Sequence, residues 1–357
     1  MSTPEKSVQR RHRVGVRRGA VVLATILVAG LVVFALSRLD LQRVGHALIT
    51  ATPGWIALAL LLMALAMFLR SVSWHETLQA GLPDTQIPWP PVVRATMIGV
   101  MASAVFPGRI GEPTRALVLS RRLAGPTRRL LPVVAGTIFS QTLINILALA
   151  ILGAVTFSAV PLLGGHVGGL AGAVAVPVVL CLLVLAGPRL LALARRARSP
   201  RVVLIAERTT ALLRLARRGL LVFTRPRQGV AAVSAQLLAW TLQWLACYSV
   251  VLALGLQSQA NFAAAAAILL AVNVSAILPA TPSNVGVFQA ACLVVLAAYG
   301  VGAGPAVAYG IILQAVEVLT ALVLGIPALL GEGLSLGDIR SAREEEAPQE
   351  LTGERSQ

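Results

Sequence analysis

Long apolar runs separated by short polar connections dominate the chain. A run of about 20 apolar residues is long enough to cross the roughly 30 Å of hydrocarbon in a bilayer as a helix. Runs of this kind lie at residues 19–37, 54–73, 131–156, 168–187, 229–255 and 305–330. The pattern therefore predicts an all-α fold, a polytopic membrane protein with about six full transmembrane helices.

Two further apolar runs break at similar phrases. Residues 92–106 end at Pro107-Gly108, and residues 262–278 end at Pro279, which opens the segment PATPSNVG. Irregular backbone inside a bilayer is tolerated only where it is buried in protein or lines a cavity. We therefore expect two re-entrant helical hairpins in addition to the full spans. Their returning arms are expected at residues 109–119 and 285–299.

The distribution of arginine predicts the orientation of the chain. Basic residues are concentrated in residues 1–18 and in the 188–228 connection, whereas the 156–167 connection and residues 228–339 contain none. Because cytoplasmic loops carry an excess of Lys and Arg, both termini and the 188–228 connection are expected in the cytoplasm. The two hairpins then enter the membrane from opposite sides.

A weak internal repeat supports this arrangement. Ser103-Ala104-x-x-Pro107 recurs as Ser275-Ala276-x-x-Pro279. The repeat predicts two halves of opposite orientation, at about 54–156 and 229–330. In transporters built from such halves, helices that are interrupted at equivalent places mark the binding site. We expect one transmembrane domain over 19–331, with the basic linker 188–228 between its halves. It lies between a basic N-terminus (1–18) and an acidic tail (332–357) that is predicted to be disordered.

Composition narrows the function classes. The chain is 57% hydrophobic and 12% charged, which is typical of a membrane protein. Its net charge of +16 lies in short loops without aromatic residues between them, so no nucleic-acid partner is expected. The cysteines occur singly and the histidines are scattered, so no disulfide framework, metal site or cofactor is expected. Arginine is used almost to the exclusion of lysine, as in GC-rich bacteria, so we expect a bacterial cytoplasmic membrane.

The first hairpin carries candidate anion-binding groups. A half-helix that begins at Gly111 points its free backbone amides at the break, and guanidinium groups bind phosphate in bidentate fashion. Arg109 and Arg115 flank the break, and Glu112 is expected to pair with one of them. The alternative is that both arginines are ordinary cytoplasmic-side charges. Upstream, Arg70 and Trp74 are interpreted as an interfacial anchor pair, with a headgroup contact as the alternative.

The second hairpin offers neutral polar groups, and the last span offers one acid. Hydroxyls and an amide at the break can hydrogen-bond a polar group, although a purely structural turn is the alternative. Glu317 is the acid inside the 305–330 span, where it could carry a proton or pair with an arginine, and Gln314 lies one turn earlier on the same face. The candidate substrate-binding residues are Ser103, Pro107, Gly108, Arg109, Gly111, Glu112, Arg115, Pro279, Thr281, Pro282, Ser283, Asn284, Gly286, Gln289, Gln314 and Glu317.

Three segments resemble the membrane region of bacterial lysylphosphatidylglycerol synthases, the flippase-like domain family. They are FPGRIGEPTRALVLSRR (106–122), LPATPSNVGVFQAACLVVLAAYGV (278–301) and RSVSW (70–74), and the resemblance extends over roughly residues 20 to 331. The family usually has Pro-Gly-Gly where this chain has Pro282-Ser283-Asn284, and often Glu where it has Gln289. The resemblance implies a part that moves lipid between leaflets, and Glu317 is expected to compensate for the missing acid.

The resemblance also implies that a soluble domain in the full-length synthases attaches lysine to phosphatidylglycerol. Residues 331–357 are too short for such a domain, so we expect no enzyme activity from this chain alone. The first hypothesis is a translocase for an anionic phospholipid or a lipid-linked phosphate. The alternatives are a glycosyltransferase that uses polyprenyl-phosphate sugars and a non-transporting partner of a separate synthase or transferase. Association into a homo-oligomer is left open.

Overall fold

A computed structural model gives the fold of the chain. It describes residues 41–83, 85–105, 110–123, 127–159, 222, 225–275 and 285–332. Within these ranges the regular elements are α-helices and no strand occurs, which confirms the predicted all-α class.

The helices follow the same order of lengths in both halves of the chain. The first half comprises α3 (Pro53–Gly81), α4 (Trp89–Val105), α5 (Gly111–Arg122) and α6 (Thr127–Ala159). The second comprises α9 (Pro226–Ala253), α10 (Phe262–Ser275), α11 (Val287–Ala298) and α12 (Ala303–Gly331). Each half therefore consists of a long helix, two short helices and a second long helix. A further helix, α2 (Leu41–Thr50), packs beside α12.

The long helices are the membrane spans. α3, α9 and α12, together with residues 130–151 of α6, are long and apolar enough to cross a bilayer, and they coincide with four of the predicted spans. α3 and α9 begin with Pro53 and Pro226, whose missing N–H costs nothing in the first helical turn. The predicted spans 19–37 and 168–187 lie outside the described residues.

The short helices form the arms of the two predicted hairpins. α4 and α5 pack against each other, and so do α10 and α11. The backbones of α4 and α5 come close at Gly99 and Gly111, where a side chain on Gly111 would collide with the Gly99 carbonyl oxygen and the Ser103 hydroxyl. Small residues allow such close packing between membrane helices. The connecting residues 106–109 and 276–284 lie outside the described residues.

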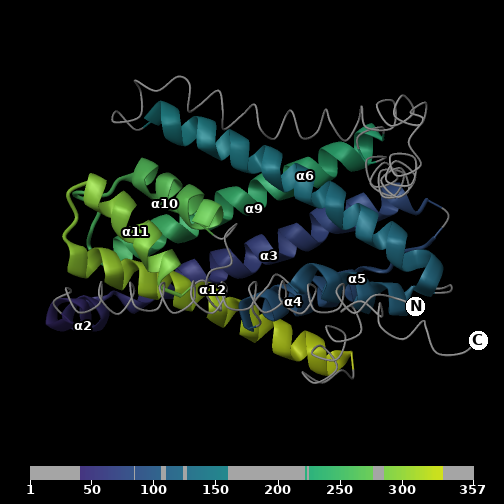
Figure 1. Cartoon of the computed structure of the whole chain (residues 1–357), viewed down its shortest axis with the longest axis horizontal. Coiled ribbons are helices and arrows are strands. Elements are labelled where there is room, and N and C mark those ends of the chain that lie inside the picture. Colours follow the sequence, from purple (N-terminus) through teal and green to yellow (C-terminus); the bar gives the residue numbers. More distant parts are fainter. Residues whose placement is uncertain are drawn as a thin grey trace, which may run out of the picture.

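The first long helices of the two halves, α3 and α9, run in opposite directions. The amide of Thr52, before α3, donates to the carbonyl of Ala253, at the end of α9, at 2.8 Å, so these two helices are antiparallel neighbours. In Figure 1, α10 and α11 lie to the left and α4 and α5 lie to the right, at opposite ends of the central helices. This is the arrangement that two hairpins entering from opposite sides require.

One residue corrects the predicted domain boundary. Glu332 was assigned to the disordered tail, yet only 2% of its side chain is exposed, and it forms ion pairs with Arg94 and Arg122. The ordered domain therefore includes Glu332. Sequence reasoning missed this because a single acid next to an acidic tail shows no sign of its distant basic partners.

Candidate functional site

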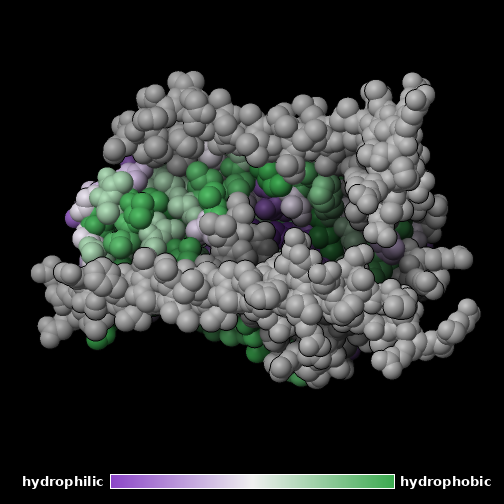
Figure 2. Space-filling model, in the orientation of Figure 1, coloured by the Kyte–Doolittle hydropathy of each residue, from purple (hydrophilic) through white to green (hydrophobic). Residues whose placement is uncertain are grey.

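Both hairpins contribute to one cavity in the centre of the protein. The cavity has a volume of about 260 Å³, and residues of six helices line it. The ends of α4 and α10 provide Val100, Ser103, Ala104, Val272 and Asn273, and α11 provides Phe288. The polar groups from the long helices are Arg70, Gln243, Gln314, Glu317 and Thr320. Figure 2 shows hydrophilic side chains in the middle of a mainly apolar face.

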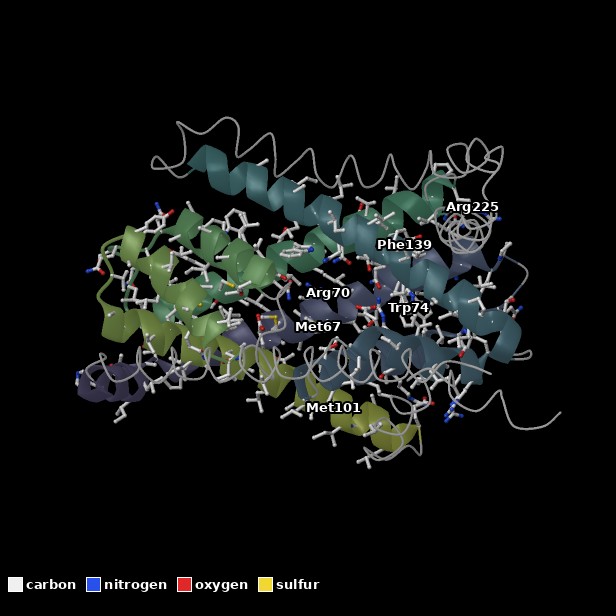
Figure 3. The ribbon with its side chains drawn as sticks, viewed as in Figure 1. Met67, Arg70, Trp74, Met101, Phe139 and Arg225 are labelled. Atoms are coloured by element: carbon white, nitrogen blue, oxygen red, sulfur yellow. The ribbon has the colours of Figure 1, made fainter. Side chains whose placement is uncertain are left out.

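Arg70 is held in the cavity wall by α9 and α6. Its Nη2 donates to Gln243 Oε1 at 2.7 Å, and its backbone carbonyl accepts from Gln141 Nε2 at 2.9 Å. The guanidinium carbon lies 5.7 Å from the centre of the Trp240 ring. Figure 3 places Arg70 near the middle of the molecule, far from Arg225 at one end of the bundle. Its Nε is buried and has no hydrogen-bond partner among the described residues.

Glu317 provides the opposite charge in the same cavity. The sequence analysis expected it to carry a proton or to pair with an arginine. In the described part of the chain its carboxylate attracts Arg70 electrostatically. A charge within a membrane domain is costly unless it is paired or functional, and here a cation and an anion share one polar cavity. Gln314 lines the cavity with Glu317, as their spacing on one helix face predicted.

Gln289 links the second hairpin to α12. Its Nε2 donates to Gln314 Oε1 at 2.5 Å, and its Oε1 accepts from the Gly286 amide at 2.7 Å. Gly286 has a φ of 88°, a conformation that favours glycine, and it begins α11. Gln289 and Gly286 therefore fix the start of α11 beside the cavity wall.

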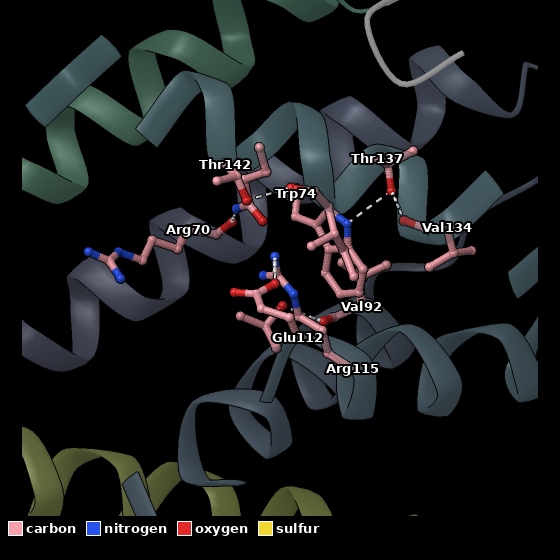
Figure 4. Close-up of polar contacts among 11 residues, drawn as sticks. Arg70, Trp74, Val92, Glu112, Arg115, Val134, Thr137 and Thr142 are labelled. Atoms are coloured by element: carbon pink, nitrogen blue, oxygen red, sulfur yellow. Dashed lines mark hydrogen bonds and ion pairs between the residues drawn. The ribbon is translucent and has the colours of Figure 1, made fainter. Parts of the chain in front are cut away.

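Arg115 lies apart from the cavity, beneath Trp74. Its Nη2 pairs with Glu112 Oε2 at 2.5 Å, which confirms the predicted pairing of Glu112 with an arginine. Its guanidinium carbon is 4.8 Å from the centre of the Trp74 ring, and Trp74 Nε1 donates to Thr137 Oγ1 at 3.2 Å. Figure 4 shows this stack of α5 on α3 and α6. These contacts hold α5, the second helix of the first hairpin, against α3 and α6.

The interpretation of Arg70 and Trp74 as an interfacial anchor pair is wrong. Trp74 is fully buried and Arg70 faces the central cavity. An arginine and a tryptophan near the end of an apolar run are typical of an interface, but the same spacing also occurs where a helix end is covered by other helices. The sequence does not show that α6 and α9 cover this part of α3.

The structure brings some of the predicted site residues together and separates others. Ser103, Gln314 and Glu317 line the cavity, Gly286 and Gln289 lie beside it, and Gly111, Glu112 and Arg115 lie on α5. The others are outside the described residues: Pro107, Gly108, Arg109, Pro279, Thr281, Pro282, Ser283 and Asn284. Gln243, Asn273 and Thr320 were missed; each is a polar residue within a mainly apolar helix, and this was the available signal.

Two substitutions test the role of Trp74. Trp74→Phe keeps an aromatic face for Arg115 but loses the hydrogen bond to Thr137 and leaves a small cavity at this buried site, so we expect a loss of about 1–3 kcal/mol. Trp74→Leu also removes the cation–π contact, which adds about 1–2 kcal/mol for a desolvated pair. Thermal unfolding in detergent measures both changes. Equal destabilisation by the two variants would show that the contact with Arg115 contributes nothing.

Comparison with known proteins identifies the family. The family described as "Lysylphosphatidylglycerol synthase TM region" matches residues 21–325, which include every helix of both halves except the end of α12. No curated protein matches the chain. The match confirms the resemblance seen in the hairpin sequences, and with the four apolar spans it makes the protein a multi-pass membrane protein. The chain belongs to the family of lysylphosphatidylglycerol synthase transmembrane regions.

Proposed function

We propose that the protein moves anionic lipid headgroups between the two leaflets through the central cavity, and that it acts as a translocase and not as an enzyme. The observation that carries this proposal is that helices of both hairpins line one cavity, and that a cation and an acid also line it. The family is consistent with a membrane protein of lipid metabolism or translocation.

The size of the cavity suits a headgroup. Pockets that enclose whole drug-sized ligands have volumes of about 300–1,000 Å³, and this cavity of about 260 Å³ lies just below that range. A phosphate-bearing headgroup can enter it while the acyl chains stay in the surrounding bilayer. The polar lining replaces water around the headgroup, whose transfer into bare hydrocarbon would be strongly unfavourable.

The charges of the cavity favour an anionic headgroup in transit. In the empty cavity Glu317 balances Arg70, so the protein does not hold an uncompensated charge. A phosphate that contacts Arg70 in the cavity can take charge-assisted hydrogen bonds from its guanidinium group, and bonds of this kind are strong. Asn273 offers a further amide from the second hairpin. Because Glu317 repels the same phosphate, binding stays weak enough for release.

A transport assay tests the proposal. The protein is reconstituted into liposomes that contain phosphatidylglycerol or phosphatidylcholine labelled on an acyl chain, and accessibility of the label to an impermeant quencher reports movement between leaflets. We expect faster movement of phosphatidylglycerol than in empty liposomes. Ala104→Phe, which fills the cavity from α4, should reduce the rate to that of empty liposomes.

The matched control is Ala315→Phe. Ala315 is exposed on α12 and does not line the cavity, so its replacement adds the same ring to the lipid-facing surface. This variant should transport phosphatidylglycerol as the wild type does. Wild-type rates equal to those of empty liposomes, or unchanged rates in Ala104→Phe, would exclude transport through this cavity.

A further inference from the structure

A second hollow lies on the lipid-facing side of α3, α4 and α12. It is a groove of about 460 Å³, and Arg94 is its only charged lining residue among those described. Leu61, Leu65 and Phe68 on α3 form one wall and are 46–56% exposed, while Leu324 and Pro327 on α12 form the other. In a bilayer, a hollow of this kind is filled by hydrocarbon, because an empty one forfeits dispersion contacts.

The groove ends at a cluster of charges with an excess of arginine. Glu332, which follows the last turn of α12, pairs with Arg94 Nη1 at 3.3 Å and with Arg122 Nε at 2.5 Å. Arg122 Nη2 also donates to the Glu332 carbonyl at 3.1 Å. One buried carboxylate thus faces two guanidinium groups that are 45% and 48% exposed. The cluster keeps a net positive charge and free N–H donors.

The charge cluster lies at the arginine-rich end of the bundle. The end of α12 meets the beginning of α4 here, and the end of α3 and the beginning of α9, with Arg225 and Arg227, lie toward the same end of the bundle. Membrane surfaces that carry anionic lipid attract such groups, at about 1 kcal/mol for each basic residue. The position of the cluster therefore suits a phosphate at the surface of one leaflet, with an acyl chain extending along the groove toward the membrane centre.

The groove and the central cavity share two helix faces. On α4, Val93 and Met97 line the groove, and Val100 and Ala104 line the cavity. These four residues are spaced at intervals of four, three and four, so they form one stripe along the helix. On α12, Leu324 and Ala328 line the groove, and Glu317 and Ala321 continue the same stripe into the cavity.

The two hollows are separated where α4 and α12 come close. Gly325 meets Met101 there, so a side chain at position 325 would collide with that methionine. Methionine side chains are flexible, so Met97 and Met101 can repack while the two helices stay in contact. The two hollows are therefore neighbours along the same helices.

We propose that the groove binds one anionic phospholipid, with its phosphate on Arg94 and Arg122 and an acyl chain between α3 and α12, and that it is the lateral access route to the cavity. The second part of this proposal rests on the proposed transport function. The binding site itself does not, because it depends only on the groove and on the charge cluster at its end.

Photo-crosslinking tests the binding site. The full chain is placed in nanodiscs with a phosphatidylglycerol that carries a diazirine on an acyl chain, and crosslinked peptides are mapped. We expect labelling of residues 61–68 and 324–328. Unlabelled phosphatidylglycerol should compete about five-fold better than phosphatidylcholine, as one net basic charge at the surface predicts. No labelling of these segments, or equal competition by both lipids, would overturn the site.

Three variants separate the contributions. Ala64→Phe fills the groove from its lipid-facing wall and should abolish labelling of both segments, whereas Ala315→Phe should leave it unchanged. The triple variant Arg94→Gln, Arg122→Gln and Glu332→Gln removes both cations together with their acid, so no buried carboxylate loses its partner. The cluster then carries no charge, so the preference for phosphatidylglycerol should disappear.

Transport by the same variants tests the access route. If the groove feeds the cavity, Ala64→Phe reduces transport of phosphatidylglycerol together with crosslinking. Normal transport in Ala64→Phe would exclude the groove as the access route. Crosslinking at the groove in a wild-type protein that does not transport would uphold the binding site and reject the proposed function instead.

Discussion

Arg70→Gln should abolish transport and destabilise the protein, and Glu317→Gln in the same chain should restore stability but not transport. Without Arg70, Glu317 is left within the membrane domain without the cation that attracts it, and an uncompensated charge there is costly. Replacement of both charges removes this penalty. Transport stays lost because the cavity then has no cation for the phosphate.

Thermal unfolding in detergent and the liposome assay measure the two parts of this prediction. Arg227→Gln is the matched control, since Arg227 is exposed at the beginning of α9 and does not line the cavity. This variant should change neither stability nor transport. Recovery of transport in the double variant would show that Arg70 serves only to neutralise Glu317.

Gly111→Leu should prevent the first hairpin from forming. A side chain at this position meets the Gly99 carbonyl oxygen and the Ser103 hydroxyl, and backbone atoms of a packed helix cannot move aside as a flexible side chain can. Overpacking typically costs about 1–3 kcal/mol, and this contact between two backbones belongs at the upper end of that range or beyond it. We expect low yield of folded protein and loss of transport.

Gly54→Leu provides the control for Gly111→Leu. Gly54 lies in the first turn of α3, and no atom of the described structure is within 4 Å of a side chain added there. Yield, size-exclusion profile and melting temperature of the two variants are compared in the same detergent. Equal behaviour of the two variants would contradict the close packing of α4 on α5.

The apolar pattern predicted most of the fold. An apolar run of about 20 residues has few alternatives to a transmembrane helix. Four of the predicted spans accordingly coincide with α3, α6, α9 and α12. The two hairpins were predicted because proline and glycine interrupt apolar runs that would otherwise continue. Both signals depend only on neighbouring residues in the chain, and this is why they could be found without a structure.

The cavity could be predicted only in part. Glu317 was recognised because an acid in an apolar span is conspicuous, and Ser103 because it is near a break. Gln243 was missed, although its amide accepts a hydrogen bond from Arg70 at 2.7 Å. A single glutamine in an apolar helix can face lipid, another helix or a cavity. Hydrophobicity does not decide among these because α9 is apolar on nearly all sides.

The contacts at Glu332 could not be predicted at all. They join Glu332 to Arg94 and Arg122, which lie 238 and 210 residues earlier in the chain. Two exposed arginines near loops look like ordinary cytoplasmic charges. Packing of α12 on α4 brings them together. Such pairings depend on the tertiary arrangement of helices and leave no local trace.

The ion pairs of Glu332 with Arg94 and Arg122 also determine which helices can move together as a rigid body. α12 closes the second half of the chain, yet it is fastened to the first hairpin by Arg94 and Arg122 and by tight packing at Gly325. A rocking unit that preserves these contacts comprises α4, α5 and α12, drawn from both halves. The boundary between the moving and the stationary helices of such a motion therefore does not coincide with the boundary between the two halves of the chain.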